Sequence, residues 1–222
     1  MRRNLQHANS SMRVRTLLAV AFALACAFGT VTNAAAQNVN PSDVPDTIKP
    51  PAGNTPFFVA HAFGSQGYTC LPTSDGGTAW STSARPEATL FIKVFGQLAQ
   101  VVTHFASIDA NPNEFAPNPV PRGGSATWQS SFDTSKVWAQ KVAGIPAGSD
   151  EQTCPNTGSI DCLLLQSIGN QEGPTGGKFL AKTTYVQRLN TKGGSAPTTA
   201  CTVGQTELRG YEADYVFFHG NE

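Results

Sequence analysis

Positive charge is scarce in this sequence. The chain has 222 residues, of which 15 are Lys or Arg and 15 are Asp or Glu, so only 14% are charged. Four of the arginines lie in the first 15 residues, and no Lys/Arg cluster follows them. Nucleic acids and anionic membrane surfaces are bound through such clusters. We therefore expect neither to be a partner.

Several catalytic and cofactor-binding motifs are also missing. No G-x-G-x-x-G follows a strand, so a dinucleotide-binding domain has no support. The segment "GPTGGKF" (173–179) has the wrong glycine spacing for a phosphate loop and ends in Phe where a hydroxyl is required, which indicates a turn. Neither H-E-x-x-H, C-x2-C nor a serine nucleophile elbow occurs. We expect no cofactor and no metal site.

The first 36 residues are typical of a secretory signal peptide. Arg13 and Arg15 precede the apolar run Leu17–Val31, and Ala34–Ala36 provides an Ala-x-Ala cleavage site. The run is shorter than the ~20 residues of a spanning helix. We therefore expect an exported protein, periplasmic or extracellular, with no membrane span after cleavage; an uncleaved anchor or lipidation at Cys26 are the alternatives. Cleavage removes four of the 15 basic residues and no acidic one, which leaves 11 against 15 and a formal charge of −4.

The cysteines agree with export. Cys70, Cys154, Cys162 and Cys201 remain after cleavage, and an even number in an exported chain favours disulfides over free or metal-bound thiols. Four cysteines allow three pairings. Cys154 and Cys162 bracket a short loop, so their pairing is the local solution, and it leaves Cys70 to pair with Cys201.

The pattern of the remaining chain is that of β-strands. Residues 37–56 contain five prolines and are expected to form an extended arm. Residues 57–222 are expected to form a single all-β domain, because short apolar or alternating runs are separated by Gly and Pro and no helix-period stripe spans three turns. The predicted strands are 57–63, 67–70, 78–82, 88–95, 100–106, a hairpin over 125–142, 162–168, 178–190 and 211–218.

The strand pattern predicts an antiparallel β-sandwich or barrel with long Pro/Gly-rich loops, at 109–124 and 143–161. In the last strand Tyr211 and Phe217 share one face while Glu212 and Asp214 share the other, which is typical of a half-buried strand. The glycines of Thr191–Gly194 indicate a turn and not a phosphate cradle.

Motifs spread over most of the chain resemble one known family. They are "AFGSQGYTC" (62–70), Trp80 with "PEATL" (86–90), "THF" (103–105), "TWQ" (127–129), "DTSKV" (133–137), "LLL" (163–165), "YVQR" (185–188), "NTKGG" (190–194) and "ADY" (213–215). Together they resemble a secreted bacterial and fungal domain-of-unknown-function family, numbered three-four-five-five, over about Lys49–Phe218. The resemblance implies no activity. Some members are labelled malate dehydrogenase, a label that this sequence, without a dinucleotide fingerprint, does not support. The family's turn glycine is Thr134 here.

Four polar or aromatic residues of the predicted strands form our candidate site. We expect a shallow pocket in which a ligand stacks on Trp128 and is hydrogen-bonded by His104, Gln187 and Arg188; the alternative is a buried network that only satisfies polar groups. The expected function is a binding or structural module for an unknown ligand. An enzyme of hydrolase type, using His104 and a carboxylate, is the alternative, and the sequence leaves open whether the protein is an enzyme. The candidate carboxylates are Asp133, Asp161, Glu172 and Asp214.

Overall fold

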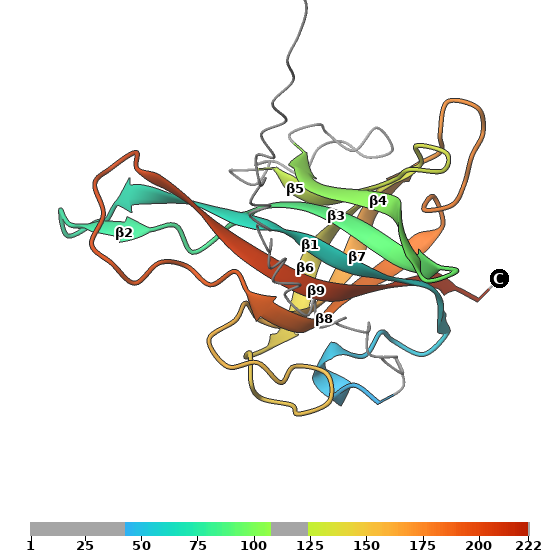
Figure 1. The fold of residues 1–222 in the computed structure, drawn as a ribbon, viewed down its shortest axis with the longest axis horizontal. Helices are drawn as coiled ribbons and strands as arrows, with labels where there is room; N and C mark the ends of the chain where they lie inside the picture. Colours follow the sequence, from blue (N-terminus) through green and yellow to red (C-terminus); the bar gives the residue numbers. More distant parts are fainter. Residues whose placement is uncertain (1–42, 108–123, 222) are drawn as a thin grey trace, which may run out of the picture. The chain divides into compact units, whose positions relative to one another are not determined.

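The computed structural model describes residues 43–107 and 124–221. The predicted signal peptide, the start of the Pro-rich arm and residues 109–123 of the first long loop lie outside these ranges. A short 3-10 helix, η1 (Asp46–Ile48), precedes nine strands (Figure 1). The strands are β1 (Asn54–Pro72), β2 (Thr78–Trp80), β3 (Arg85–Val94), β4 (Gln97–Ser107), β5 (Ser125–Ser130), β6 (Lys136–Ile145), β7 (Cys162–Gln171), β8 (Thr183–Gly193) and β9 (Thr206–Gly220). Over the described ranges, no helix has the length and apolarity that crossing a membrane requires.

All neighbouring strands are antiparallel, and the sheet closes on itself. The strand order is β2-β1-β3-β4-β5-β6-β7-β8-β9, and β1 also pairs with β9. The ring therefore contains every strand except β2, which pairs only with the end of β1 beyond the ring, at Cys70–Pro72. The all-β prediction is confirmed. Of the two architectures that the sequence left open, the closed sheet is the one formed.

Strand β1 does not end at Gly64, where the sequence predicted a boundary, but runs on to Pro72. Gly64 lies opposite Ala88 of β3. A Cβ atom on Gly64 would come within 2.1 Å of the carbonyl oxygen of Glu87 and 2.4 Å of the Ala88 Cβ. Glycine thus permits a close approach of two strands at this point, and it does not break the strand.

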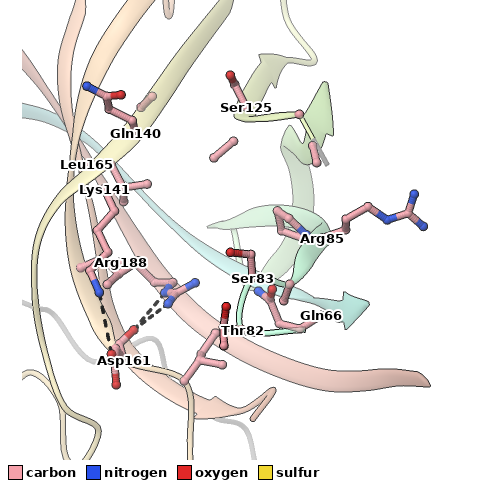
Figure 2. A pocket seen from close by; sticks show the side chains of 18 of the residues that line it. Gln66, Thr82, Ser83, Arg85, Ser125, Gln140, Lys141, Asp161, Leu165 and Arg188 are labelled. Atoms are coloured by element: carbon pink, nitrogen blue, oxygen red, sulfur yellow. Dashed lines mark hydrogen bonds and ion pairs between the residues drawn. The ribbon is translucent and has the colours of Figure 1, made fainter. Parts of the chain in front are cut away.

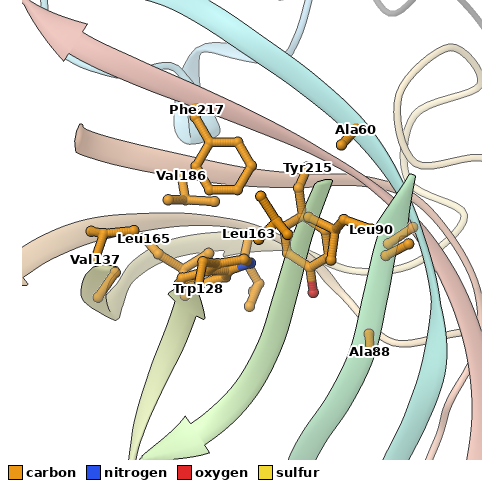
Figure 3. Close-up of a cluster of buried hydrophobic side chains, with 14 of the residues drawn as sticks. Ala60, Ala88, Leu90, Trp128, Val137, Leu163, Leu165, Val186, Tyr215 and Phe217 are labelled. Carbon is orange, nitrogen blue, oxygen red and sulfur yellow. The ribbon is translucent and has the colours of Figure 1, made fainter. Parts of the chain in front are cut away.

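The interior of the ring is filled by side chains (Figure 3). Trp128, Tyr215 and Phe217 are the largest of them, and each is at most 1% exposed. Small side chains such as Ala60 and Ala88 face inward from β1 and β3 and leave room for these rings. A ring of this strand number is just wide enough to be filled in this way.

A second apolar cluster lies on the outside of the ring. Val44 and Ile48, from the segment that contains η1, are buried against Leu189, Val216 and Phe218 of β8 and β9. Strand β9 is therefore covered on both faces. The prediction of a half-buried strand was wrong for this reason. The Pro-rich arm was predicted to be extended, but its described part contains the helical turn η1 and packs on the outside of the ring.

Both predicted disulfides are present. Cys70, near the end of β1, is bonded to Cys201 in the connection between β8 and β9. Cys154 and Cys162 close the second long loop, and both belong to the outer apolar cluster. The first bond ties the extended β1–β9 ribbon at its end, and the second fixes the loop that reaches one opening of the ring.

The turn between β5 and β6 is held by Asp133. Its Oδ1 accepts hydrogen bonds from the Ser135 amide at 3.1 Å and the Ser135 hydroxyl at 2.7 Å, and its Oδ2 accepts one from the Phe179 amide at 2.8 Å. Desolvation raises the pKa of Asp133, but these hydrogen bonds together lower it below the usual value. A Cβ on Gly177 would lie 2.4 Å from the Asp133 Cβ. The "GPTGGKF" segment therefore wraps this carboxylate.

Candidate binding site at the ring mouth

His104 and Trp128 meet as predicted, but inside the core. They lie opposite each other on β4 and β5, and their rings stack with centroids 4.2 Å apart and planes 5° apart. His104 is 3% exposed and Trp128 is fully buried. His104 Nδ1 donates a hydrogen bond to the Thr127 carbonyl oxygen at 2.9 Å. The face of Trp128 on which a ligand was expected to stack is therefore occupied by His104.

The chemistry of His104 follows from this position. Burial lowers the pKa of the imidazole from 6.5 to about 3; the hydrogen bond to Thr127 opposes this shift, and the charge of Arg188 adds to it. His104 is thus a neutral core side chain at physiological pH. Among the described ion pairs, none joins it to a carboxylate. The pairing that the hydrolase alternative requires is not formed.

Gln187 and Arg188 lie on opposite faces of the sheet, because successive residues of a strand alternate. Gln187 is fully buried under η1, and its Nε2 donates to the Ile48 carbonyl oxygen at 2.6 Å. Arg188 faces the inside of the ring, opposite Tyr215 of β9. The four predicted residues therefore do not line one pocket: two lie in the core, one is outside, and Arg188 alone reaches a cavity.

That cavity occupies one mouth of the ring and has a volume of about 680 Å³ (Figure 2). Its wall combines parts of β1, β7 and β8, the β2–β3 connection, the start of β5, the middle of β6 and the second long loop. The residues that line it are Gln66, Tyr68, Thr82, Ser83, Ala84, Arg85, Pro86, Ala106, Gly124, Ser125, Ala126, Ala139, Gln140, Lys141, Ser159, Ile160, Asp161, Leu163, Leu165, Ile168, Arg188, Ser195 and Ala196. The volume lies within the usual range for small-molecule sites, about 300–1,000 Å³.

Arg188 is fixed at the base of this cavity. Its Nε and Nη2 donate to the Asp161 carbonyl oxygen at 3.1 and 2.8 Å, and its guanidinium projects into the space shown in Figure 2. Burial raises the pKa of the neighbouring Tyr215 phenol, and the charge of Arg188 and hydrogen bonds with Tyr211 and Arg188 oppose this shift in part. Within the described part of the chain, no carboxylate side chain lies at ion-pair distance from Arg188. The cation is oriented by neutral groups.

The described residues of the lining are positively charged overall. Arg85, Lys141 and Arg188 contribute three cations to this part of the lining, and Asp161 contributes one carboxylate. Lys141 Nζ lies 4.0 Å from Asp161 Oδ2, with both side chains about half exposed, so this pair contributes little stability and leaves Lys141 able to turn toward a ligand. Concave surfaces with charges of one sign concentrate ligands of the opposite sign.

Gln66 was missed by the sequence analysis. Its side chain lines the cavity from β1 and is 3% exposed, and its Nε2 has no hydrogen-bond partner among the described residues. The neighbouring Tyr68 differs, because its hydroxyl donates to the Gly194 carbonyl oxygen at 2.7 Å. Buried amide groups are nearly always hydrogen-bonded. Gln66 Nε2 is thus a buried donor on the wall of the mouth, without a partner among the described residues.

The glycine pair at the end of β8 allows the chain to pack closely on β9. Gly193 belongs to β8 and pairs with Tyr211, so the strand extends beyond the start of the predicted turn. The Gly193 amide donates to the Ser159 hydroxyl at 2.9 Å. Both glycines have positive φ, 72° and 80°. They bring the chain close to β9: a Cβ on Gly193 would lie 2.6 Å from the Gly210 carbonyl oxygen.

A second polar group, on the outer face, was also missed. His61 Nδ1 lies 2.7 Å from Oδ1 of Asp214, whose other oxygen accepts from Asn190 Nδ2 at 2.8 Å. His61 Nε2 is 3.8 Å from a Glu212 carboxylate oxygen. No hydroxyl or thiol is hydrogen-bonded to this imidazole in the described contacts. The group joins β1, β8 and β9, and we assign it a structural part.

Comparison with known proteins gives a family and no function. Neither a search of curated proteins nor a search of solved structures found a match to the chain. One family model matches residues 51–219, which is most of the sequence and includes every strand of the ring. The resemblance seen in the motifs is thereby confirmed. The chain belongs to the family described as "Protein of unknown function (DUF3455)".

Proposed function

We propose that this protein is an exported binding module that holds a small polar molecule in the mouth of its ring. Export is supported by the signal-peptide pattern of residues 1–36 and is compatible with the two disulfides. The single observation that carries the binding function is the Gln66 amide, buried on the cavity wall with its Nε2 unpartnered among the described residues. A polar ligand would satisfy this group.

The cavity also has the organisation of a binding site. Leu163 and Leu165 provide an apolar wall, and polar groups converge on it from β1, β6 and β8. The second disulfide closes the loop that supplies Asp161, so the rim is held in place before a ligand arrives. Preformed pockets of this kind bind with a smaller entropic cost. His104 does not reach this cavity, so no observation favours the hydrolase alternative.

The proposal is tested by closing the mouth. Ser83 is exposed on the rim, and Ser83→Trp would place a large ring over the cavity without disturbing the core. Ser74→Trp, at the exposed turn after β1, is the matched control. The mature protein is screened by thermal shift against neutral sugars, sugar acids, amino acids and inorganic anions. A ligand at about 100 times its Kd stabilises by about 2.7 kcal/mol, or roughly 5–10 °C for a domain of this size.

We expect at least one class of small molecule to raise the melting temperature of the wild type and of Ser74→Trp, and to leave Ser83→Trp unchanged. Native mass spectrometry of protein purified from the exporting host gives a second readout, because a retained ligand adds a defined mass. The proposal is wrong if no class shifts the wild type, or if Ser83→Trp responds as strongly as the control.

A further inference from the structure

We propose that the ligand is a hydroxyl-rich carboxylate, of the chemical class of the sugar acids, with its carboxylate held by Arg188 and Lys141. This inference rests on the proposed function, since it names the chemistry of the same site. Its starting point is the imbalance of charge in the mouth, whose described lining carries three cations and one carboxylate, although the mature chain is expected to be acidic as a whole.

Arg188 is the group that selects an anion. Arg188 is of intermediate exposure, and its guanidinium is oriented by two hydrogen bonds to one carbonyl oxygen. An oriented cation without a carboxylate partner can make charge-assisted hydrogen bonds to a bound anion, and these are stronger than neutral ones. Planar, oriented guanidinium groups suit carboxylates in particular. Lys141, which has only a 4.0 Å pairing with Asp161, lies on the same wall and can supply a second positive charge.

The rest of the rim suits hydroxyl groups. It is formed by short hydroxyl and amide side chains, which are Thr82, Ser83, Ser125, Gln140, Ser159 and Ser195. Among the described lining residues Tyr68 is the only aromatic one, and its hydroxyl is already bound to the Gly194 carbonyl oxygen. The wall thus provides no stacking surface for a flat aromatic ligand. Many small donors and acceptors around a cationic base match a compact molecule with several hydroxyls and one acid group.

Phosphate fits the mouth less well. Phosphate sites commonly use several backbone amides at a glycine loop or a helix N-terminus. The Gly193 amide beside this cavity already binds the Ser159 hydroxyl, and no described element that borders the cavity is a helix. The positive charge that would hold an anion in the mouth therefore comes from side chains, and the Gln66 side-chain amide adds a neutral donor.

Calorimetric titration of the mature protein separates these chemistries. The probes are galacturonate and glucuronate, the neutral galactose and glucose, and acetate and inorganic phosphate as anions without sugar hydroxyls. We expect the uronates to bind at least about 10-fold more tightly than the other probes, a difference of about 1.4 kcal/mol. Their affinity should fall as salt is raised from 0.05 to about 0.5 M, since part of it is charge attraction.

Two charge variants and a control test the residues. Lys141→Gln, at an exposed position that does not endanger folding, should weaken uronate binding about 3- to 10-fold, and Arg188→Gln should weaken it more than 10-fold. Lys178→Gln removes an exposed lysine that is paired with Glu172 away from the mouth, and it should bind as the wild type does. Near-UV circular dichroism checks the fold of Arg188→Gln, and if that fold is lost, Lys141→Gln still decides the case.

The inference and the function that it rests on fail in different ways. If neutral sugars bind as tightly as uronates and Ser83→Trp abolishes their binding, the mouth is a binding site but the acid is not required, and the inference is overturned. If acetate or phosphate binds as tightly as the uronates, the hydroxyl requirement is overturned. Unchanged uronate affinity in Lys141→Gln contradicts the assignment of the carboxylate. Binding of no probe of any class contradicts the proposed function itself.

Discussion

As the pH falls below about 6.5, the buried imidazole of His104 should make this protein less stable. His104 has a pKa of about 3 in the folded chain, against an ordinary value of 6.5, because it is buried beside Trp128. Between these two pH values the unfolded chain binds a proton that the folded chain does not bind. The stabilisation is therefore complete above about pH 6.5 and is lost as the pH falls below that value.

The expected size follows from the shift. Each pH unit below 6.5 removes about 1.4 kcal/mol, so unfolding at pH 5 should be easier than at pH 7.5 by about 2 kcal/mol from His104 alone. His104→Phe keeps a flat ring against Trp128 but cannot be protonated. It will lower stability at pH 7.5, because the Thr127 carbonyl loses its donor, yet it should remove this part of the pH dependence.

The assay is urea unfolding at pH 7.5 and 5.0 for three proteins. Val102→Ala, a fully buried change in the same strand as His104, is the control. It should lower stability at both pH values and keep the wild-type difference between them. A wild-type difference that survives in His104→Phe would refute the reasoning, since it would show that other groups bind the proton.

Three further outcomes are expected. Gly193→Ala should lower the free energy of unfolding by about 2–5 kcal/mol, because positive φ costs ~1–2 kcal/mol and the Cβ clash adds ~1–3 kcal/mol. Gly204→Ala, where φ is positive but the space is open, should lose only the first part, and equal losses in thermal melts would contradict this. Asp133→Ala should cost about 2 kcal/mol at pH 7, and since the folded pKa is lowered, the wild type should lose this advantage as the pH falls below about 4, measured as converging melting curves. Cys70→Ala should destabilise more than Cys154→Ala, because the loop it closes spans 131 residues and not 8; the reverse order in urea melts would exclude the chain-entropy explanation.

Period-two alternation and glycine or proline boundaries predicted most of the strands, because the ring buries one face of nearly every strand. What they could not predict is what covers the other face. Val216 and Phe218 are buried in an outer cluster that also contains Val44 and Ile48, so what covers them includes a segment more than 160 residues away in the chain. Gly64 failed as a boundary for a similar reason, since its role is the close approach of β3.

Of the four candidate residues, only Arg188 lines the mouth. His104 and Trp128 stack on each other in the core, because polarity in a strand does not reveal whether a side chain faces a cavity or the core. Gln187 and Arg188 were assigned to one pocket, which strand alternation alone forbids. Gln66 carries no motif, and it joins Arg188 only because the ring closes between β1 and β9 and brings residues from the two halves of the chain to one mouth.

A crystal structure of the mature protein grown with galacturonate tests the central claim most directly. The account predicts ligand density in the cavity of about 680 Å³, with the carboxylate within hydrogen-bond distance of the Arg188 guanidinium and a ligand oxygen accepting from Gln66 Nε2. An empty mouth at a saturating ligand concentration, or a ligand whose carboxylate points to solvent and away from Arg188, would contradict it.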